Sequence, residues 1–284
     1  MLDGKTILIT GATSGIGRVT ARELADGGAG IVFVARNREK AEETREWIIR
    51  ETGNRSVDFI ISDLSARDGV YSAADRFKSG HAGPDVLVNN AGAFFARRME
   101  SPDGIEMTFA LNHLAPFLLT NLLLDSMKVL PRARIVTVSS HAHVGASMSF
   151  DDLEGRKRYR GWTAYGQSKL ANLLFTFELA RRLSGSKVTA NALHPGFVAT
   201  GFGMNNGTLM KAAMGLAQRF GAITPEEGAR TSVYLASSPE VEGVSGKYFV
   251  KCAIAEPSRA ALDEEAARRL WAVSAEMVRF PIAA

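Results

Sequence analysis

KTILITGATSGIGRVTARELAD, residues 5–26, carries the strongest structural signal in this chain. Residues 5–10 form a short, β-branched, apolar run without alternation, which is typical of a strand buried on both faces in a parallel sheet. A glycine-rich loop (11–17) and a helix pattern (18–26) follow. This order suits a bound dinucleotide, because glycines let the backbone approach a pyrophosphate and the helix N-terminus offers free N–H groups. The alternative is a tight turn with only a structural role.

Strand and helix patterns alternate along the rest of the chain, without internal repeats or low-complexity stretches. The sequence predicts further strands at 30–35, 57–62, 85–89, 133–138, 188–193 and 246–250, and helices at 37–52, 68–78, 107–124, 163–183 and 224–237. This alternation predicts an α/β protein, a three-layer doubly wound Rossmann fold with a seven-stranded parallel sheet. We expect a single domain over residues 1–284, with a substrate lid at about 201–222 and a C-terminal helix at about 258–278.

Composition narrows the class of protein. The 284 residues are 46% hydrophobic and 23% charged, and the net charge is +4. The lone cysteine, Cys252, excludes an internal disulfide and fits a reducing compartment. The most basic stretch, RKRYR at Arg156–Arg160, is better explained as a solvated loop than as a nucleic-acid patch. No apolar run is long enough for a signal peptide or a membrane span. We therefore expect a cytoplasmic protein without a nucleic-acid partner.

The expected helix at 163–183 carries a candidate catalytic pair. Tyr165 and Lys169 are four residues apart, so their side chains project from one side of the helix. An ammonium beside a phenol favours the phenolate, which predicts a tyrosine pKa below its ordinary value of about 10. Such a phenol exchanges protons with an alcohol or a carbonyl near neutral pH. Taken alone, this spacing is more typical of an exposed helix face.

Several motifs occur in one order along the chain. They are TGxxxGxG at 10–17, NNAG at 89–92, NHLAPFLLT at 112–120, VSS at 138–140, YGQSK at 165–169 and HPGFVAT at 194–200. Together they resemble the classical short-chain dehydrogenase/reductase family. The long segment between Ser140 and Tyr165, the helix that follows it and the HPG sequence resemble its retinol-dehydrogenase-like branch. The resemblance covers nearly the whole chain and implies hydride transfer between a nicotinamide cofactor and a carbonyl/alcohol pair.

The resemblance also implies the catalytic set. Ser140 and Tyr165 would hold the substrate oxygen, Tyr165 would supply the proton, and Lys169 would lower the phenol pKa and bind the cofactor ribose. Asn112 would hold a water that links the lysine to solvent. A satisfied buried amide or a helix kink is the other interpretation of Asn112, and Pro116 should bend that helix. The histidines at 141 and 143 lack a third ligand nearby, so we expect no metal site.

NADP(H) is expected in preference to NAD(H). The second strand ends at Ala35, where an NAD enzyme would have an acidic residue, and Arg36 follows. A guanidinium suits a 2′-phosphate, and Arg18 lies within reach of the same phosphate. Exposed arginines at helix starts are the alternative for both residues. For Asp63, which would meet the adenine, a helix N-cap is the alternative. Asn89 is expected to be structural. The full set of expected cofactor contacts is Gly11, Thr13, Ser14, Gly15, Ile16, Gly17, Arg18, Arg36, Asp63, Leu64, Asn90, Ala91, Gly92, Tyr165, Lys169, Pro195, Gly196, Val198 and Thr200.

The sequence predicts an NADP(H)-dependent oxidoreductase that interconverts a carbonyl and an alcohol. Apolar residues in the expected lid favour a lipophilic aldehyde, ketone or alcohol, although the same residues would also suit a core. Two other classes are compatible with the motifs: a nucleotide-binding regulatory protein without turnover, and a nucleotide-sugar epimerase or dehydratase. Family members often pair through long helices, so we expect a homodimer or a homotetramer unless the terminal helix covers them.

Overall fold

The computed structural model describes residues 2–198 and 223–281. Eight strands form one sheet in the order β3-β2-β1-β4-β5-β6-β7-β8. The parallel strands are β1 Thr6–Thr10, β2 Gly30–Ala35, β3 Val57–Ile61, β4 Val86–Asn89, β5 Ala133–Val138, β6 Val188–His194 and β7 Tyr248–Val250. These seven strands confirm the predicted parallel sheet. The prediction missed β8 (Ala253–Ile254), which pairs antiparallel with β7.

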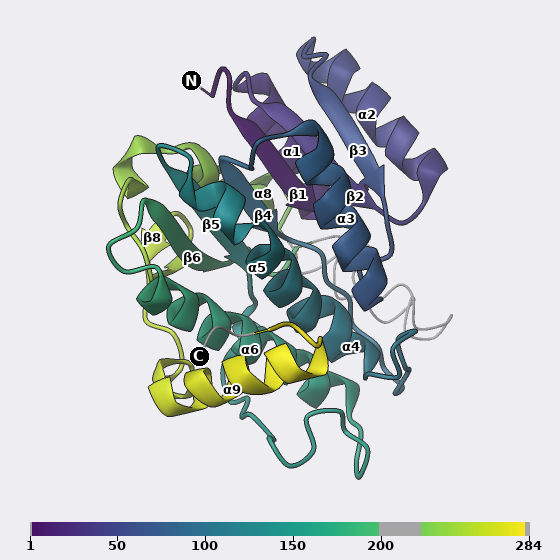
Figure 1. Ribbon diagram of the computed structural model, residues 1–284, viewed down its shortest axis with the longest axis vertical. Coiled ribbons are helices and arrows are strands. Elements are labelled where there is room, and N and C mark those ends of the chain that lie inside the picture. Colours follow the sequence, from purple (N-terminus) through teal and green to yellow (C-terminus); the bar gives the residue numbers. More distant parts are fainter. Residues whose placement is uncertain (1, 199–222, 282–284) are drawn as a thin grey trace.

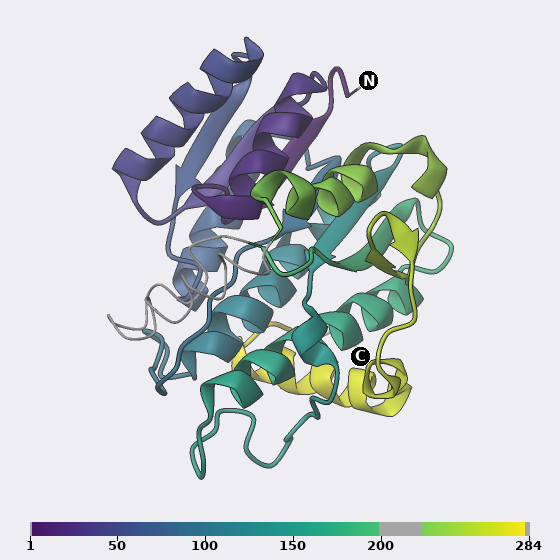
Figure 2. The same ribbon diagram turned by 180° about the vertical axis from the view of Figure 1, so that it is seen from behind.

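Helices cover both faces of the sheet, as Figures 1 and 2 show from opposite sides. Buried side chains accordingly form two clusters. One joins the sheet to α1, α2 and α8, and the other joins it to α3, α5, α6 and α9. The helices are α1 Gly15–Asp26, α2 Arg38–Thr52, α3 Arg67–Gly80, α5 Ala115–Lys128, α6 Gly161–Arg182, α8 Pro225–Ser237 and α9 Glu264–Met277.

The chain starts in the middle of the sheet, which positions the site. From β1 it moves outward through β2 and β3, and then returns to the other side of β1 with β4. The connections therefore diverge at the carboxyl ends of β1 and β4, and this switch point is where open α/β sheets bind ligands. Strand β1 is apolar on both faces, because Ile7 and Ile9 join one buried cluster and Leu8 joins the other.

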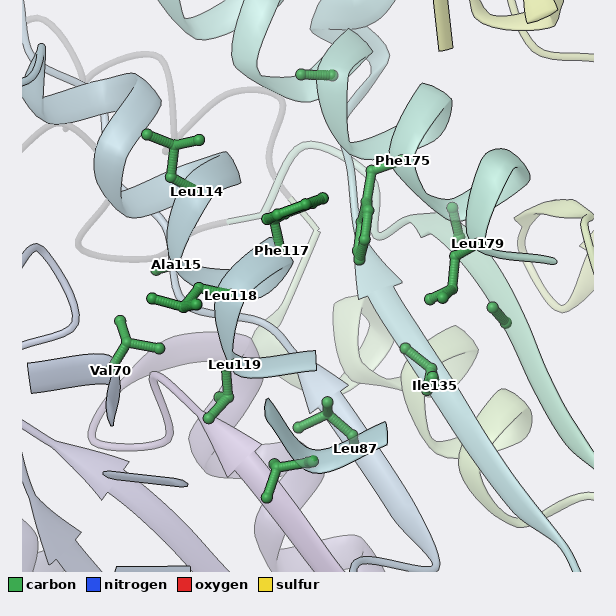
Figure 3. Packing of buried hydrophobic residues seen from close by; sticks show 14 of the residues in the cluster. Val70, Leu87, Leu114, Ala115, Phe117, Leu118, Leu119, Ile135, Phe175 and Leu179 are labelled. Carbon is green, nitrogen blue, oxygen red and sulfur yellow. The ribbon is translucent and has the colours of Figure 1, made fainter. Parts of the chain in front are cut away.

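The core beneath α5 is shown in Figure 3, where Leu119 lies near Leu87 of β4, Leu118 points toward Val70 of α3, and Phe117 lies toward Phe175 of α6. Burying each such side chain contributes about 1.5–3 kcal/mol. Among the described residues, one stretch, Met107–Lys128, is long and apolar enough to cross a membrane, and 72% of its most apolar window is buried inside the protein. That burial is what a core helix requires.

The predicted single helix at 107–124 has three parts. A short α4 (Met107–Phe109) leads into a π-helical turn, η1 (Ala110–Leu114), and then into α5. We expected Pro116 to bend the helix near Asn112, and the structure has the wider π-helical turn at that place. Pro116 has no N–H, so the Asn112 carbonyl, four residues earlier, cannot accept the usual α-helical bond. π-Helical turns of this kind are frequent at functional sites.

The C-terminal stretch predicted as one helix is a 3-10 turn, η4 (Arg259–Leu262), followed by α9. The break lies at Asp263, whose side chain accepts a bond from the N–H of Ala266 and caps α9. Helix α9 packs against α6, and Trp271 meets the rings of Phe117 and Phe175 at centroid distances of 5.0 and 5.8 Å. Figure 1 shows α9 lying across α6. The terminal segment therefore closes one face of the core.

Candidate active site

The glycine loop after β1 has the backbone geometry that glycine allows. Gly11 and Gly15 have φ of +70° and +54°, which disfavour other residues. A Cβ on Gly17 would lie 2.3 Å from both Asn90 Nδ2 and the Gly11 carbonyl oxygen. The loop is thus packed directly against the end of β4.

Asn90 fastens this loop. Its Nδ2 donates to the carbonyl oxygens of Thr10 (2.9 Å) and Gly11 (3.0 Å). In return, Thr10 Oγ1 accepts bonds from the N–H groups of Asn90 and Ala91, both at 3.0 Å. The Asn90 side chain therefore shapes the loop. Asn89 is structural, as expected, and its Nδ2 donates to Thr120 Oγ1 at 2.9 Å. The bonding role of Thr10 was missed, although its place in the TG motif is a signal for it.

The start of α1 offers an anion site. Ser14 makes no side-chain cap bond and the first turn holds no acidic residue, so the free N–H groups and the helix dipole favour an anion there. Arg18 stacks on Trp47, with its guanidinium 4.1 Å from the ring centroid, and its Nε is buried without a partner in the described structure. Arg36 follows the end of β2 and is exposed. This donor set fits the phosphates of a nicotinamide dinucleotide.

Other expected cofactor residues lie along the same edge of the sheet. Asp63 Oδ1 accepts bonds from the N–H and Oγ of Ser65, while Ala66 is the N-cap of α3, so the N-cap alternative for Asp63 is wrong. The Leu64 side chain is buried in the core. Val198 pairs with Ile223 in an isolated bridge after β6. Thr200 and the expected lid at 201–222 lie outside the described residues. The remaining expected contacts are at the loop after β1 (Thr13, Ile16), after β4 (Gly92) and after β6 (Pro195, Gly196).

Tyr165, Lys169 and Ser140 converge at the carboxyl end of β5. Tyr165 lies on α6, is 8% exposed, and its hydroxyl is hydrogen-bonded to the Ser140 side chain. Lys169 Nζ lies 5.7 Å from the Tyr165 ring centroid and donates to the Val138 carbonyl oxygen at 3.0 Å. The neighbouring Ser139 is turned away, since its Oγ donates to the Lys169 carbonyl oxygen at 2.7 Å. Of the two serines, Ser140 is therefore the one whose side chain meets the phenol.

The predicted direction of the tyrosine pKa shift is wrong for this structure. Burial raises the pKa of Tyr165 to about 12, and the hydrogen bond from Ser140 opposes only part of this effect. Burial also lowers the pKa of Lys169 to about 8. Removing each group from water disfavours its charged form, which raises the tyrosine pKa and lowers the lysine pKa. Spacing alone does not reveal burial, so the sequence could not give the sign.

Asn112 lies in the π-helical turn and is fully buried. Its Oδ1 accepts from the N–H of Ala93 (2.8 Å), and its Nδ2 donates to the Ala93 carbonyl oxygen and to Ser168 Oγ, both at 3.0 Å. The side chain is therefore a satisfied buried amide, which was one of the two interpretations. A Cβ on Gly92 would lie 3.2 Å from Asn112 Oδ1 and 3.3 Å from Lys169 Nζ, so these three residues are neighbours.

Aromatic rings flank the Tyr165 phenol. Phe94 and Trp162 have centroids 4.5 Å apart, and each meets the Tyr165 ring edge-on, at 6.1 and 6.2 Å. Trp162 is 55% exposed. Sequence patterns did not predict this aromatic wall, because Phe94 and Trp162 are 68 positions apart and belong to no motif. Across residues 2–198 and 223–281, no group of three His, Cys, Asp or Glu side chains is placed to hold a metal.

Comparison with known proteins places this geometry in a family. The family described as "short chain dehydrogenase" matches residues 5–210. Human retinol dehydrogenase 14 is 45% identical, over 98% of this chain and 87% of the relative, and human retinol dehydrogenase 13 is 44% identical, over 98% and 85%.

Solved structures agree with the sequence comparison. An uncharacterized protein from Mycobacterium paratuberculosis has a TM-score of 0.78 and 35% identity, over 99% of this chain and 96% of its own. A short-chain dehydrogenase from Escherichia coli, complexed with NADPH, has a TM-score of 0.69 and 25% identity, over 89% and 98%. This chain therefore belongs to the short-chain dehydrogenase family and is retinol-dehydrogenase-like.

Proposed function

We propose that this protein is an NADP(H)-dependent oxidoreductase that interconverts a lipophilic carbonyl compound and its alcohol. One observation carries the proposal: the hydroxyls of Tyr165 and Ser140 meet in a buried site beside Lys169, at the sheet edge where the glycine loop lies. Two hydroxyls that converge in this way can hold one carbonyl oxygen. Donors aimed at the oxygen on which charge develops are the main source of acceleration in such reactions.

A bound nicotinamide cofactor supplies the hydride. With its pKa raised to about 12, Tyr165 stays protonated near neutral pH and is a proton donor for a developing alkoxide. Ser140 holds the same oxygen by a hydrogen bond. Lys169 stabilises the phenolate left after proton transfer, and its lowered pKa of about 8 places its own proton within reach of neutral pH. The Asn112 carbonyl, without an α-helical donor, suits a water that returns a proton to Lys169.

The preference for NADP(H) rests on Arg18 and Arg36. Stacking on Trp47 holds the Arg18 guanidinium at the start of α1, and Arg36 replaces the acidic residue that would repel a 2′-phosphate. Two related solved structures, from Escherichia coli and Shigella flexneri, are described as complexes with NADPH and NADP. The aromatic wall of Phe94 and Trp162 supports an apolar, flat substrate beside the Tyr165 hydroxyl.

A cofactor-oxidation assay tests the proposal. Purified protein with NADPH and a panel of aldehydes, ketones and retinoids should show turnover, and NADH should support less. Tyr165→Phe, which keeps the ring and removes the donor, is the matched control and should bind NADPH without turnover. NADPH binding by the wild type without turnover on any substrate would favour a regulatory binding protein. NAD that stays bound through purification would favour an epimerase or a dehydratase.

A further inference from the structure

A buried histidine connects the Ser140 backbone to the C-terminal part of the chain. His143 is 1% exposed, and its Nδ1 lies 2.6 Å from the carbonyl oxygen of Ser140. Its Nε2 lies 3.1 Å from the backbone N–H of Ser258. A carbonyl oxygen only accepts and an amide N–H only donates, so Nδ1 carries the proton and Nε2 is unprotonated and accepts. The imidazole is neutral and its tautomer is fixed by both partners.

These bonds hold the residue that meets the catalytic phenol. The Ser140 carbonyl also accepts from the His143 backbone N–H at 3.2 Å, and Ser140 Oγ accepts from the Ala142 N–H at the same distance. The His143 ring packs edge-on against Tyr248 of β7, with centroids 5.3 Å apart. The turn that carries Ser140 is therefore held by a side chain whose far end bonds to a residue 115 positions away.

Ser258, at the other end of this connection, belongs to a segment that packs against the core. Ser258 begins the 3-10 turn η4, which leads into α9, and α9 packs on α6. A second histidine connects the same segment to the catalytic region, because His113 Nε2 lies 2.8 Å from Ser274 Oγ of α9. His113 directly follows Asn112 in the π-helical turn and is fully buried. The C-terminal segment thus reaches both the Ser140 turn and the Asn112 turn.

We propose that His143 is a positioning residue through which the backbone of Ser258 sets the place of the Ser140 hydroxyl opposite Tyr165. The inference rests on the proposed function, because a displaced Ser140 hydroxyl would be detected as a lower rate of turnover. A displacement of about 1 Å at a reacting group costs up to about 100-fold in rate, so the loss of one anchoring bond has a measurable effect. The glycine loop after β1 and Arg18, which would hold the cofactor phosphates, are not part of this connection, so we expect NADPH binding to persist when it is broken.

Ser258 offers a matched pair of variants. Its φ is −62°, a value that proline adopts, so Ser258→Pro removes the N–H that donates to His143 and places the ring Cδ against Nε2, which breaks the connection. Ser258→Ala keeps that N–H and removes only a buried hydroxyl that has no partner among the described atoms. We expect Ser258→Pro to lower kcat about tenfold or more, with the NADPH Kd unchanged. Ser258→Ala should keep the wild-type kcat.

His143→Asn completes a double-mutant cycle. The side-chain Nδ2 of the asparagine takes the position of the imidazole Nδ1, so it still donates to the Ser140 carbonyl oxygen. The asparagine has no atom at the position of Nε2, so the Ser258 N–H loses its acceptor. Adding Ser258→Pro to His143→Asn should therefore cause no further loss of kcat, whereas losses that arise independently at the two positions would add.

Equal kcat values for Ser258→Pro and Ser258→Ala, or additive losses in the cycle, would overturn the proposal. Should Ser258→Pro not fold, an undiminished kcat for His143→Asn overturns it alone, and a reduced one with intact NADPH binding supports it. Wild-type protein without turnover would instead refute the proposed function.

Discussion

Acidification should destabilise this protein through His113. Burial lowers the pKa of His113 from 6.5 to about 3, so the folded protein keeps the imidazole neutral where the unfolded chain protonates it. The folded pKa lies below the unfolded one. The stability tied to this group is therefore complete above about pH 6.5 and is lost progressively as the pH falls toward 3.

The size of the loss follows from the two pKa values. Near pH 5.5 an unfolded histidine is about ten-to-one protonated, which favours unfolding by about 1.4 kcal/mol relative to neutral pH. His113 remains neutral in the folded protein throughout this range, so the loss depends only on protonation of the unfolded chain. A destabilisation of this size lowers the midpoint of thermal unfolding by roughly 3 to 6 °C.

Urea unfolding near pH 7.5 and near pH 5.5 would measure this loss. His113→Gln keeps a donor for Ser274 and removes the titrating group, so its loss of unfolding free energy between the two pH values should be smaller than that of the wild type by about 1.4 kcal/mol. His81→Gln, a half-buried histidine stacked on Phe77, is the control and should keep the wild-type loss. A His113→Gln protein that loses as much stability on acidification as the wild type would refute the reasoning.

Three further predictions concern the site. Tyr165→Phe should abolish carbonyl turnover while NADPH binding, followed by fluorescence titration, is retained; persistent turnover would exclude Tyr165 as the acid. Arg36→Asp should shift the ratio of kcat/KM toward NADH, because a carboxylate repels a 2′-phosphate, and an unchanged ratio would remove Arg36 from cofactor selection. Gly92→Ala would place a methyl 3.2 Å from Asn112 Oδ1 and 3.3 Å from Lys169 Nζ, so kcat should fall with little change in the melting temperature. A wild-type kcat in that variant would show that the Lys169 ammonium can move away from the added methyl without loss of catalysis.

The sequence predicted most of the sheet because its strands are continuous apolar runs bounded by glycines and helix caps. Thr224 illustrates this well: its cap signal marked the start of α8, and the structure shows a complete capping box with Glu227. Strand β8 was missed because two residues have no periodicity. They follow a turn in which Lys251 and Cys252 take positive φ, which neither residue type signals.

The candidate site was predicted as a set of residues but not as an environment. Motif order brought Ser140, Tyr165 and Lys169 together, whereas the pKa values of the tyrosine and the lysine depend on what buries them. The bond partner of His143 lies 115 positions away in the chain, in a segment without a recognised motif. Long-range partners of this kind follow from the packing of whole elements, which local patterns do not contain.

The bonds from Asn90 to Thr10 and Gly11 have a consequence for the kinetics of nucleotide capture. Because the protein's own amide and hydroxyl groups already hold the loop after β1 in shape, a nucleotide arriving there meets a rigid receptor and need not organise it. The entropy of ordering that backbone is lost once, when the chain folds, and not again at each encounter. Association should then be governed by diffusion and charge, with little contribution from a slow rearrangement of this loop.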